Sequence, residues 1–297
     1  MMAITGEMIK DLRERSGAGM MDAKKALEEN GGNMEQAIDW LRQKGVSKAA
    51  KKSGRTAAEG MVAALSDGTT GVMIEINCET DFTGRNDNFT NFVKKVAELA
   101  MAAKAGDVET VKALDFGGGK TVADALTELV ATTGENMTLR RAAKLSVSNG
   151  IVGSYVHLGG KIGVLVAIEG TTDATVAKQV SMHIAASNPQ ALDKSSIDPD
   201  VLAREKAIYT AQAAESGKPA AVVEKIVEGR VNKFLEEVCL VEQPFVMDPD
   251  RKVMKVVTDV AAGAKVVGFV RFGLGEGIEK ETTDFAAEVA AQVAASA

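Results

Sequence analysis

A short pattern occurs twice in the chain, and it constrains the fold more than any other feature. Residues 68–76 read GTTGVMIEI and residues 160–168 read GKIGVLVAI, an offset of 92 residues. Each run follows a second apolar run, at residues 61–65 and 153–158, across a glycine-containing turn, which is typical of a β-hairpin. Each is followed by Thr-Asp and then by apolar residues at helical spacing. The pattern predicts two related α+β halves with antiparallel sheets, the product of duplication.

The N-terminal segment predicts three short helices that form a small bundle. Apolar residues recur at helical spacing, with breaks at residues 16–19 and at Asn-Gly-Gly, residues 30–32. Asn33 is placed to cap the third helix, with Gln36 at the position that can reach back to it. Residues 42–55 then carry six Lys or Arg and no acidic residue. We interpret this run as a solvated linker, and a contact with RNA or the ribosome is the alternative.

The remaining elements follow from start and stop signals. Residues 122–129 and 138–145 are predicted to be helices. Asp198-Pro199 begins a pattern that turns near residues 216–219 and continues to Leu235, which predicts an antiparallel helical hairpin. A helical segment, a strand and a terminal helix after Asp284 end the chain. The expected domains are residues 1–54, with the basic linker; 55–150; 151–280, interrupted by the hairpin at 190–237; and a C-terminal module at 281–297.

Few residues in the sequence favour an enzyme. His157 and His183 are the two histidines, and neither has a second His or Cys at metal-ligand spacing. We expect His183 to be packed and hydrogen-bonded, His157 to be more accessible, and Cys78 and Cys239 to be small core residues. The sequence predicts no catalytic residue, no metal and no cofactor.

Two glycine-rich stretches resemble phosphate-binding loops without fitting them. Residues 117–121 lack the first glycine that a phosphate loop requires, and residues 273–277 lack the last glycine of the dinucleotide fingerprint. We interpret residues 117–121 as a flexible helix boundary. The competing hypothesis, a nucleotide-dependent enzyme that uses these residues, predicts that the isolated protein binds ATP or GTP.

Net charge and hydropathy limit the partners and the compartment. A formal net charge of −6 argues against strong nucleic-acid binding, which needs clustered Lys and Arg. The longest apolar runs fall far short of the roughly 20 residues that cross a bilayer. The first residues lack the basic and apolar regions of a secretory signal. We therefore expect a cytoplasmic protein that makes no membrane contact.

Apolar residues stand among turn-forming residues at three places. These are Met20-Met21 in GAGMMD, Phe82 in TDFTGRND, and residues 245–247 between two prolines. Each of them could fold inward to anchor its loop, because single loop hydrophobes are ordinary. The three together favour a partner-binding surface.

Several of these segments carry a family resemblance. The motifs KDLRERSGAGMMDAKKAL, INCETDF, GSYVH, KIGVLVA, QPFVMDP and GFVRFGLGEGIEK occur in this order. With them the whole chain resembles bacterial elongation factor Ts, the nucleotide exchange factor of the GTPase elongation factor Tu. The resemblance implies a ubiquitin-associated-like (UBA-like) N-terminal bundle, two α+β core subdomains, an inserted coiled coil and a C-terminal module. It also implies that the partner is elongation factor Tu, GDP-bound and nucleotide-free, and it allows a homodimer within a 2:2 complex.

The resemblance also assigns contact residues. In this family the Thr-Asp-Phe turn enters the GTPase domain, and its Phe wedges between helices near the magnesium and phosphate site; here these residues are Asp81 and Phe82. Thr83 and Gly84 follow where relatives often have an apolar residue and Ala. The helix from Asp284 is implied to dock on the GTPase domain as well. The other implied contacts are Arg13, Met20, Met21, Lys24, His157, Val246 and Met247.

Overall fold

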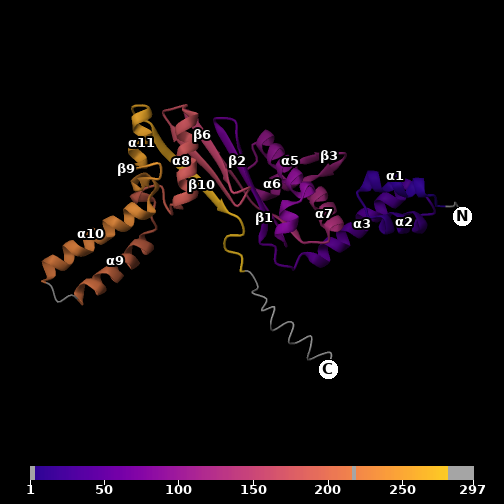
Figure 1. Ribbon diagram of the computed structural model, residues 1–297, viewed down its shortest axis with the longest axis horizontal. Helices are drawn as coiled ribbons and strands as arrows, with labels where there is room; N and C mark the ends of the chain where they lie inside the picture. Colours follow the sequence, from indigo (N-terminus) through magenta and orange to yellow (C-terminus); the bar gives the residue numbers. More distant parts are fainter. Residues whose placement is uncertain (1–3, 216–218, 280–297) are drawn as a thin grey trace, which may run out of the picture.

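The computed structural model describes residues 4–215 and 219–279. Three helices lie at one end of an elongated molecule, two sheets lie in the middle, and a helical hairpin lies at the other end (Figure 1). This arrangement confirms the α+β class expected from the sequence. The predicted helix after Asp284 falls outside the described residues, and the domain boundaries stay predictions.

The N-terminal unit is a bundle of α1 (Gly6–Ser16), α2 (Met20–Glu29) and α3 (Met34–Lys52). The side chains of Thr5 and Asn33 cap α1 and α3 by accepting a backbone N–H, which satisfies a donor that the helix leaves free. The likeness to a ubiquitin-associated domain stays a prediction. The small buried core consists of Leu12, Ala23, Ala26, Leu27 and Ala37.

Helix α3 is longer than the sequence predicts. Residues 42–52, expected to be part of a linker, continue the helix. Lys, Ala and Gln are good helix formers, and the single Gly45 costs only about 1 kcal/mol. The extended part packs on α7 (Val122–Thr133). Residues 42–52 of the basic run therefore form a packed helix between the bundle and the rest of the chain.

The first half of the core is an antiparallel sheet in the order β1-β2-β5. Its strands are β1 (Glu59–Ser66), β2 (Thr70–Cys78) and β5 (Met137–Ser146). Helix α5 (Asp87–Ala103) packs on β1 and β2 with its buried phenylalanines and valines. The smaller elements are α4 (Asp81–Arg85), α6 (Val108–Ala113), β3 (Asp115–Gly117) and β4 (Lys120–Thr121).

The prediction of a helix at residues 138–145 is wrong. These residues form most of β5, which pairs with β2 along its length. Arg, Ala, Lys and Leu in this segment are good helix formers, so strand pairing overrides local propensity here. Arg140 and Arg141 reach the buried carboxylate of Glu75 on β2, which a helix in this place would not allow.

The second half repeats this layout. The strands β6 (Gly150–His157), β7 (Ile162–Glu169) and β10 (Lys265–Gly273) form an antiparallel sheet in the order β10-β7-β6. Helices α8 (Ala174–Ser187) and α11 (Val253–Val260) share its apolar core. In both halves the central strand is paired with the strand before it and is followed by Thr-Asp and a helix. Two related α+β halves are therefore present, as the repeat predicts.

The two sheets pack on each other through a small apolar layer. Val62 and Met73 from the first sheet meet Leu165 and Phe272 from the second. The approach is close, because a Cβ added to Gly163 would lie 2.4 Å from Cγ1 of Val62. The two halves are therefore in direct contact at this layer.

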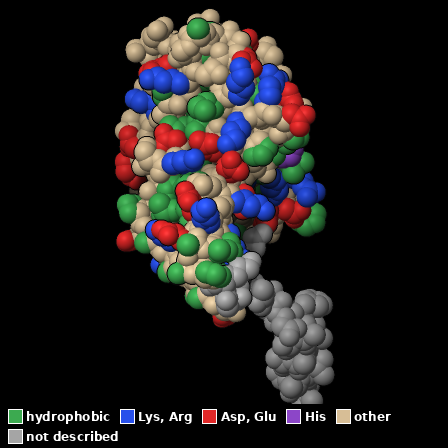
Figure 2. All heavy atoms as spheres, turned by 90° about the vertical axis from the view of Figure 1, so that its left-hand side faces the viewer, with side chains coloured by type: hydrophobic (Ala, Val, Ile, Leu, Met, Phe, Trp, Pro, Cys, Tyr) green, Lys and Arg blue, Asp and Glu red, His purple; other side chains and the backbone are tan. Residues whose placement is uncertain are grey.

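The predicted helical hairpin is present as α9 (Pro199–Ala214) and α10 (Ala220–Val238), which project from the second half (Figure 1). The described segment beyond it contains β8 (Pro244–Phe245) and β9 (Asp248–Lys252). Short 3-10 helices flank the hairpin at Lys194–Ser196 and Leu240–Glu242. Basic and acidic side chains alternate on this end of the molecule, with no wide area of one charge in the view of Figure 2.

Candidate functional site

Phe82 lies in the first turn of α4, directly after the central strand of the first half. Its side chain is 84% exposed, the most exposed of the large apolar residues described. Burying a Phe side chain is worth about 1.5–3 kcal/mol, so this ring loses that stabilisation in the free protein. An exposed ring on a short, well-formed helix is therefore available for a partner.

The turn that carries Phe82 is closely packed on the start of β1. A Cβ on Gly84 would lie 3.3 Å from the backbone nitrogen of Gly60, so two glycines let α4 approach the strand. Asp81 forms an ion pair with Arg85 on the same helix at 3.0 Å. That pair is solvent-exposed, so it contributes only about 0.2–1 kcal/mol and a partner could replace it.

The loop between β6 and β7 carries His157 and lies against the same stretch of β1. The backbone N–H of Val62 donates to the carbonyl of Gly160 at 2.8 Å. Since α4 packs at Gly60 and this loop packs at Val62, the structure brings Phe82 and His157 to one edge of the core. His157 is half-buried, and its Nδ1 lies 2.8 Å from the Tyr155 hydroxyl.

Leu158 is a candidate contact that the sequence reading missed. Its side chain is 70% exposed, and its backbone is left-handed with φ of 48°, which is rare for a branched residue. The signal was available, because an apolar residue before Gly159-Gly160 is the same kind of feature as Phe82 in its turn. An exposed leucine in this conformation marks the β6–β7 loop as part of the candidate surface.

Met20 and Met21 lie far from this edge. They are 60% and 76% exposed and occupy the first turn of α2, where the sequence suggests a loop. Arg13 on α1 and Lys24 on α2 are exposed on the same bundle, with Lys24 in a loose pair with Glu28 at 3.7 Å. These four residues form a separate group at the end of the molecule occupied by α1 and α2 (Figure 1).

The third group lies in the turn between β8 and β9. Val246 and Met247 are each 47% exposed, whereas the adjacent Phe245 is buried. Of the two alternatives left open by the sequence, Phe245 is therefore a loop anchor and its neighbours are surface residues. The backbone N–H of Val246 donates to Nδ1 of His183 at 3.1 Å, which fixes the turn to α8.

The packed histidine is as the sequence predicts. His183 is fully buried, and its Nε2 lies 2.9 Å from Oε1 of Gln243. Burial holds the pKa of His183 below its ordinary value, although the Gln243 contact opposes this shift. Both ring nitrogens are engaged in the folded core, so this residue is structural.

The cysteines are also core residues. Cys78 and Cys239 are free and fully buried. Burial raises the pKa of the Cys78 thiol to about 12, and it also raises that of Cys239. Neither thiol is therefore a nucleophile at neutral pH.

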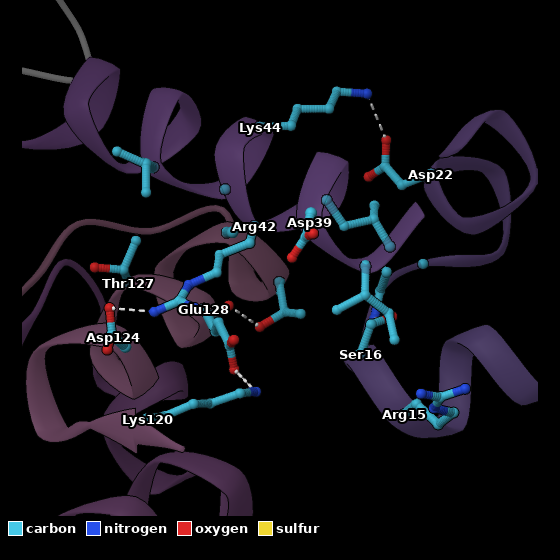
Figure 3. A pocket seen from close by; sticks show the side chains of 18 of the residues that line it. Arg15, Ser16, Asp22, Asp39, Arg42, Lys44, Lys120, Asp124, Thr127 and Glu128 are labelled. Atoms are coloured by element: carbon cyan, nitrogen blue, oxygen red, sulfur yellow. Dashed lines mark hydrogen bonds and ion pairs between the residues drawn. The ribbon is translucent and has the colours of Figure 1, made fainter. Parts of the chain in front are cut away.

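A cleft of about 510 Å³ separates the N-terminal bundle from α7. Figure 3 shows charged side chains lining it, with Arg42 directed toward Asp124 and Lys120 toward Glu128. Lys44 likewise pairs with Asp22 at 3.0 Å. Because these charges neutralise one another, the cleft has the character of a seam between two packed parts.

The glycine-rich stretch beside the cleft does not fit a phosphate site. The predicted helix boundary is present, because Thr121 is the N-cap of α7. The residues before it were not predicted as strands, and Gly117–Gly119 form the turn of the β3–β4 hairpin. The ammonium of Lys120 is 2.6 Å from Glu128. The start of α7 is closed by a capping box between Thr121 and Asp124, which places a carboxylate where a phosphate would bind.

The basic run at residues 42–55 is partly neutralised within the chain. Arg42 pairs with Asp124, Lys44 with Asp22, and Arg55 with Glu79 at 3.4 Å. These pairs remove part of the positive field that an RNA contact would use.

The described residues also bear on metal binding and on membrane insertion. Between residues 4 and 279, the described parts hold no group of three or more His, Cys, Asp or Glu side chains that could bind a metal ion. None of the helices seen there is both long and apolar enough for a membrane span.

Comparisons with known proteins agree on one family. The family described as elongation factor TS matches residues 79–276. The elongation factor Ts of Magnetococcus marinus is 52% identical over 298 residues, covering 97% of this chain and 98% of the relative. Those of Paramagnetospirillum magneticum and Gluconobacter oxydans are each 55% identical, and each alignment covers 98% of both chains.

Proposed function

The chain belongs to the elongation factor Ts family of translation elongation, and from this premise we propose that it binds the GTPase elongation factor Tu and promotes GDP release. The observation that carries the proposal is Phe82, 84% exposed on a turn packed against the core. With Asp81, this ring enters the GTPase near its magnesium and phosphate site. No bond is made or broken by this chain, so it acts as a binding protein and not as an enzyme.

The free energy of GDP binding is too large for Phe82 alone to overcome, so the proposed function requires further contacts. A GDP bound with nanomolar affinity is held by about 12 kcal/mol, whereas burial of one Phe yields about 1.5–3 kcal/mol. Phe82 therefore distorts the nucleotide site while other contacts stabilise the complex. Factor and nucleotide then weaken each other's binding reciprocally. The contacts proposed for this stabilisation are Arg13, Met20, Met21, Lys24, His157, Val246 and Met247.

The factor meets elongation factor Tu in its GDP-bound form and remains on the nucleotide-free form until a new nucleotide enters. A factor for translation works where ribosomes work, so we place the chain in the cytoplasm. A homodimer within a 2:2 complex is one assembly that the family resemblance allows. Light scattering of the purified complex distinguishes it from a 1:1 complex by mass.

The proposal is tested by release of fluorescent GDP from elongation factor Tu of the same source. Wild-type protein should accelerate release, and the double substitution Asp81→Ala/Phe82→Ala should abolish most of the acceleration. Met254→Ala is a matched control, because Met254 is a 50% exposed apolar residue on α11 outside the proposed contacts.

The dependence on factor concentration separates the two roles. Phe82→Ala should lower the maximal rate of release more than it raises the half-saturating concentration, because the ring acts on the nucleotide site. Equal losses in both quantities would refute the wedge role. No acceleration by the wild type would refute the exchange function itself.

A further inference from the structure

A single carboxylate holds the turn that carries Phe82. Glu135 lies in the connection between α7 and β5 and is half-buried. Its Oε2 accepts the backbone N–H of Thr80 at 3.1 Å. Its Oε1 accepts the hydroxyls of Thr80 and Thr83, each at 2.7 Å. Three donors from one short turn therefore converge on this side chain.

These bonds join the residues on both sides of Phe82. Thr80 is the N-cap of α4, and its hydroxyl also accepts the backbone N–H of Thr83 at 3.3 Å. Helix α4 has only five residues, far fewer than the roughly 12–15 that make an isolated helix stable. Its direction must come from tertiary contacts, and Glu135 supplies a charge-assisted set of them.

The connection that carries Glu135 is itself fixed. The adjacent Asn136 donates its side-chain amide to the carbonyl of Arg55 at 2.7 Å, and its backbone N–H donates to the carboxylate of Glu79. Asn136 is buried, so these bonds are shielded from water. Glu135 is thus a firm support for α4, in addition to the Gly84–Gly60 contact.

We propose that Glu135 is a positioning residue for nucleotide exchange. Its carboxylate orients Phe82 through Thr80 and Thr83, so that the ring enters the partner GTPase in the direction that weakens GDP binding. This inference rests on the proposed exchange function. It assigns to Glu135 no contact with the GTPase or the nucleotide.

The test compares maximal rates of fluorescent GDP release. Glu135→Ala removes all three of these hydrogen bonds and should lower the maximal rate at least about tenfold, the factor that corresponds to the lower limit for loss of a single charge-assisted hydrogen bond. The half-saturating concentration should stay within about twofold, because the docking contacts remain. Glu128→Ala is the matched control, since Glu128 is a carboxylate on α7 that pairs with Lys120 and does not touch α4.

A double-mutant cycle shows whether Glu135 acts through Phe82. In a Phe82→Ala background, Glu135→Ala should change the maximal rate by less than about twofold, because there is no ring left to position. The same tenfold loss in both backgrounds would overturn the proposal. So would a shift confined to the half-saturating concentration, which would mean a direct contact with the partner.

Variants at Thr83 provide a milder and independent probe. Thr83→Ser keeps the hydroxyl that donates to Glu135 and should retain the wild-type rate, whereas Thr83→Val removes it and should lower the rate. Amide hydrogen exchange of the free protein should be faster at Thr83 and Gly84 in Glu135→Ala than in Glu128→Ala. Unchanged exchange there would overturn the positioning role even if the rate falls.

The GDP-release assay distinguishes failure of the exchange function from failure of the positioning role of Glu135. If the wild type does not accelerate GDP release, the exchange function fails, and the role of Glu135 in it fails as well. If the wild type is active and Glu135→Ala is equally active, the positioning role alone is wrong.

Discussion

At the scale of single residues, a buried imidazole links the turn of Val246 and Met247 to the core. Nδ1 of His183 accepts the backbone N–H of Val246 and so carries no proton, while Nε2 faces the amide oxygen of Gln243 and donates to it. A second proton on the ring would break the Val246 bond and place a charge in an apolar core. The folded state therefore requires the neutral form.

This requirement gives a pH dependence with a definite sign. The pKa of His183 is lowered in the folded state from its ordinary value of 6.5, so the unfolded chain binds the proton first as pH falls. Stability from this residue is present above that value and is lost as pH falls below it. Between pH 7.5 and 5.5 the loss can reach about 1.4 kcal/mol. Urea unfolding at both pH values measures it.

His183→Gln is the comparison for this prediction. The variant lacks the titrating ring, so its disadvantage relative to the wild type should shrink as pH falls from 7.5 to 5.5. Equal pH slopes in the two proteins would contradict the assignment. Only the difference between the proteins is used, which removes the contribution of carboxylates common to both.

Single residues also show how far a sequence can predict a site. The position of Phe82 and Met247 among turn formers marks both as candidate contacts, with an inward-folded loop anchor as the alternative, and the structure shows both to be exposed. Phe245 lies among the same turn formers and is buried, because its ring packs against His183 and the apolar core of the second half. No local sequence pattern marks Glu135 as part of the site, because its partners Thr80 and Thr83 are distant in sequence. Local chemistry finds candidates, but only tertiary structure identifies what holds them.

At the scale of elements, the joint between α3 and α7 connects the bundle to the core. Gly45 is buried there, and a Cβ added to it would lie 3.4 Å from Cβ of Ala131. The nearby ion pair of Arg42 and Asp124, at 3.0 Å, is half-exposed. Close helix packing, and not charge, is therefore the main source of stability at this joint.

This comparison predicts different outcomes for substitutions in α3. Gly45→Leu should force α3 away from α7, with an overpacking cost of about 1–3 kcal/mol. Arg42→Ala should cost less than about 1 kcal/mol. Gly45→Ala is the matched control, because its Cβ makes an ordinary contact and alanine favours a helix.

Limited trypsin digestion measures the opening of this joint. Residues 51–55 lie where the chain leaves α3, and Lys51 and Arg55 there are exposed trypsin sites. Cleavage in this segment should be faster in Gly45→Leu and nearly unchanged in the other two variants. Faster cleavage in Arg42→Ala than in Gly45→Leu would show that the ion pair holds the joint instead.

The central and edge strands differ in how well the sequence predicts them. Strands β2 and β7 were predicted from their composition, because a central strand buried on both faces is mostly apolar. Strand β5 was predicted as a helix, because an edge strand with one paired side has no such constraint. Its state is decided by pairing with β2 and by the ion pairs of Arg140 and Arg141 with Glu75.

At the scale of the whole molecule, a buried carboxylate fastens the two halves. Glu75 on β2 is fully buried and pairs with Arg140 and Arg141 on β5. It also accepts the backbone N–H of Gly275 at 2.9 Å, while Arg141 donates to the carbonyl of Gly273 at 2.7 Å. The first sheet therefore holds the end of β10, so the molecule presents its surface groups on one rigid core.

The distribution of exposed apolar residues along this core suggests a division of roles. Met20 and Met21 lie on the bundle, Phe82 and Leu158 at the central edge, and Met247 beyond the second sheet. A partner that touches all three groups gains affinity from each, but a nucleotide site can touch only one. The end groups should therefore determine affinity, and the centre should determine the rate of release.

This division predicts opposite kinetic signatures for matched substitutions. Met20→Ser/Met21→Ser and Val246→Ser/Met247→Ser should each raise the half-saturating concentration about tenfold, since each removes apolar area worth more than 1.4 kcal/mol on burial. Their maximal rates should stay within about twofold of the wild type, whereas Phe82→Ala lowers the maximal rate. Met254→Ala should change neither quantity. A lower maximal rate in either end variant would mean that the ends also act on the nucleotide site, and the rigid core joining them to Phe82 would then carry that effect.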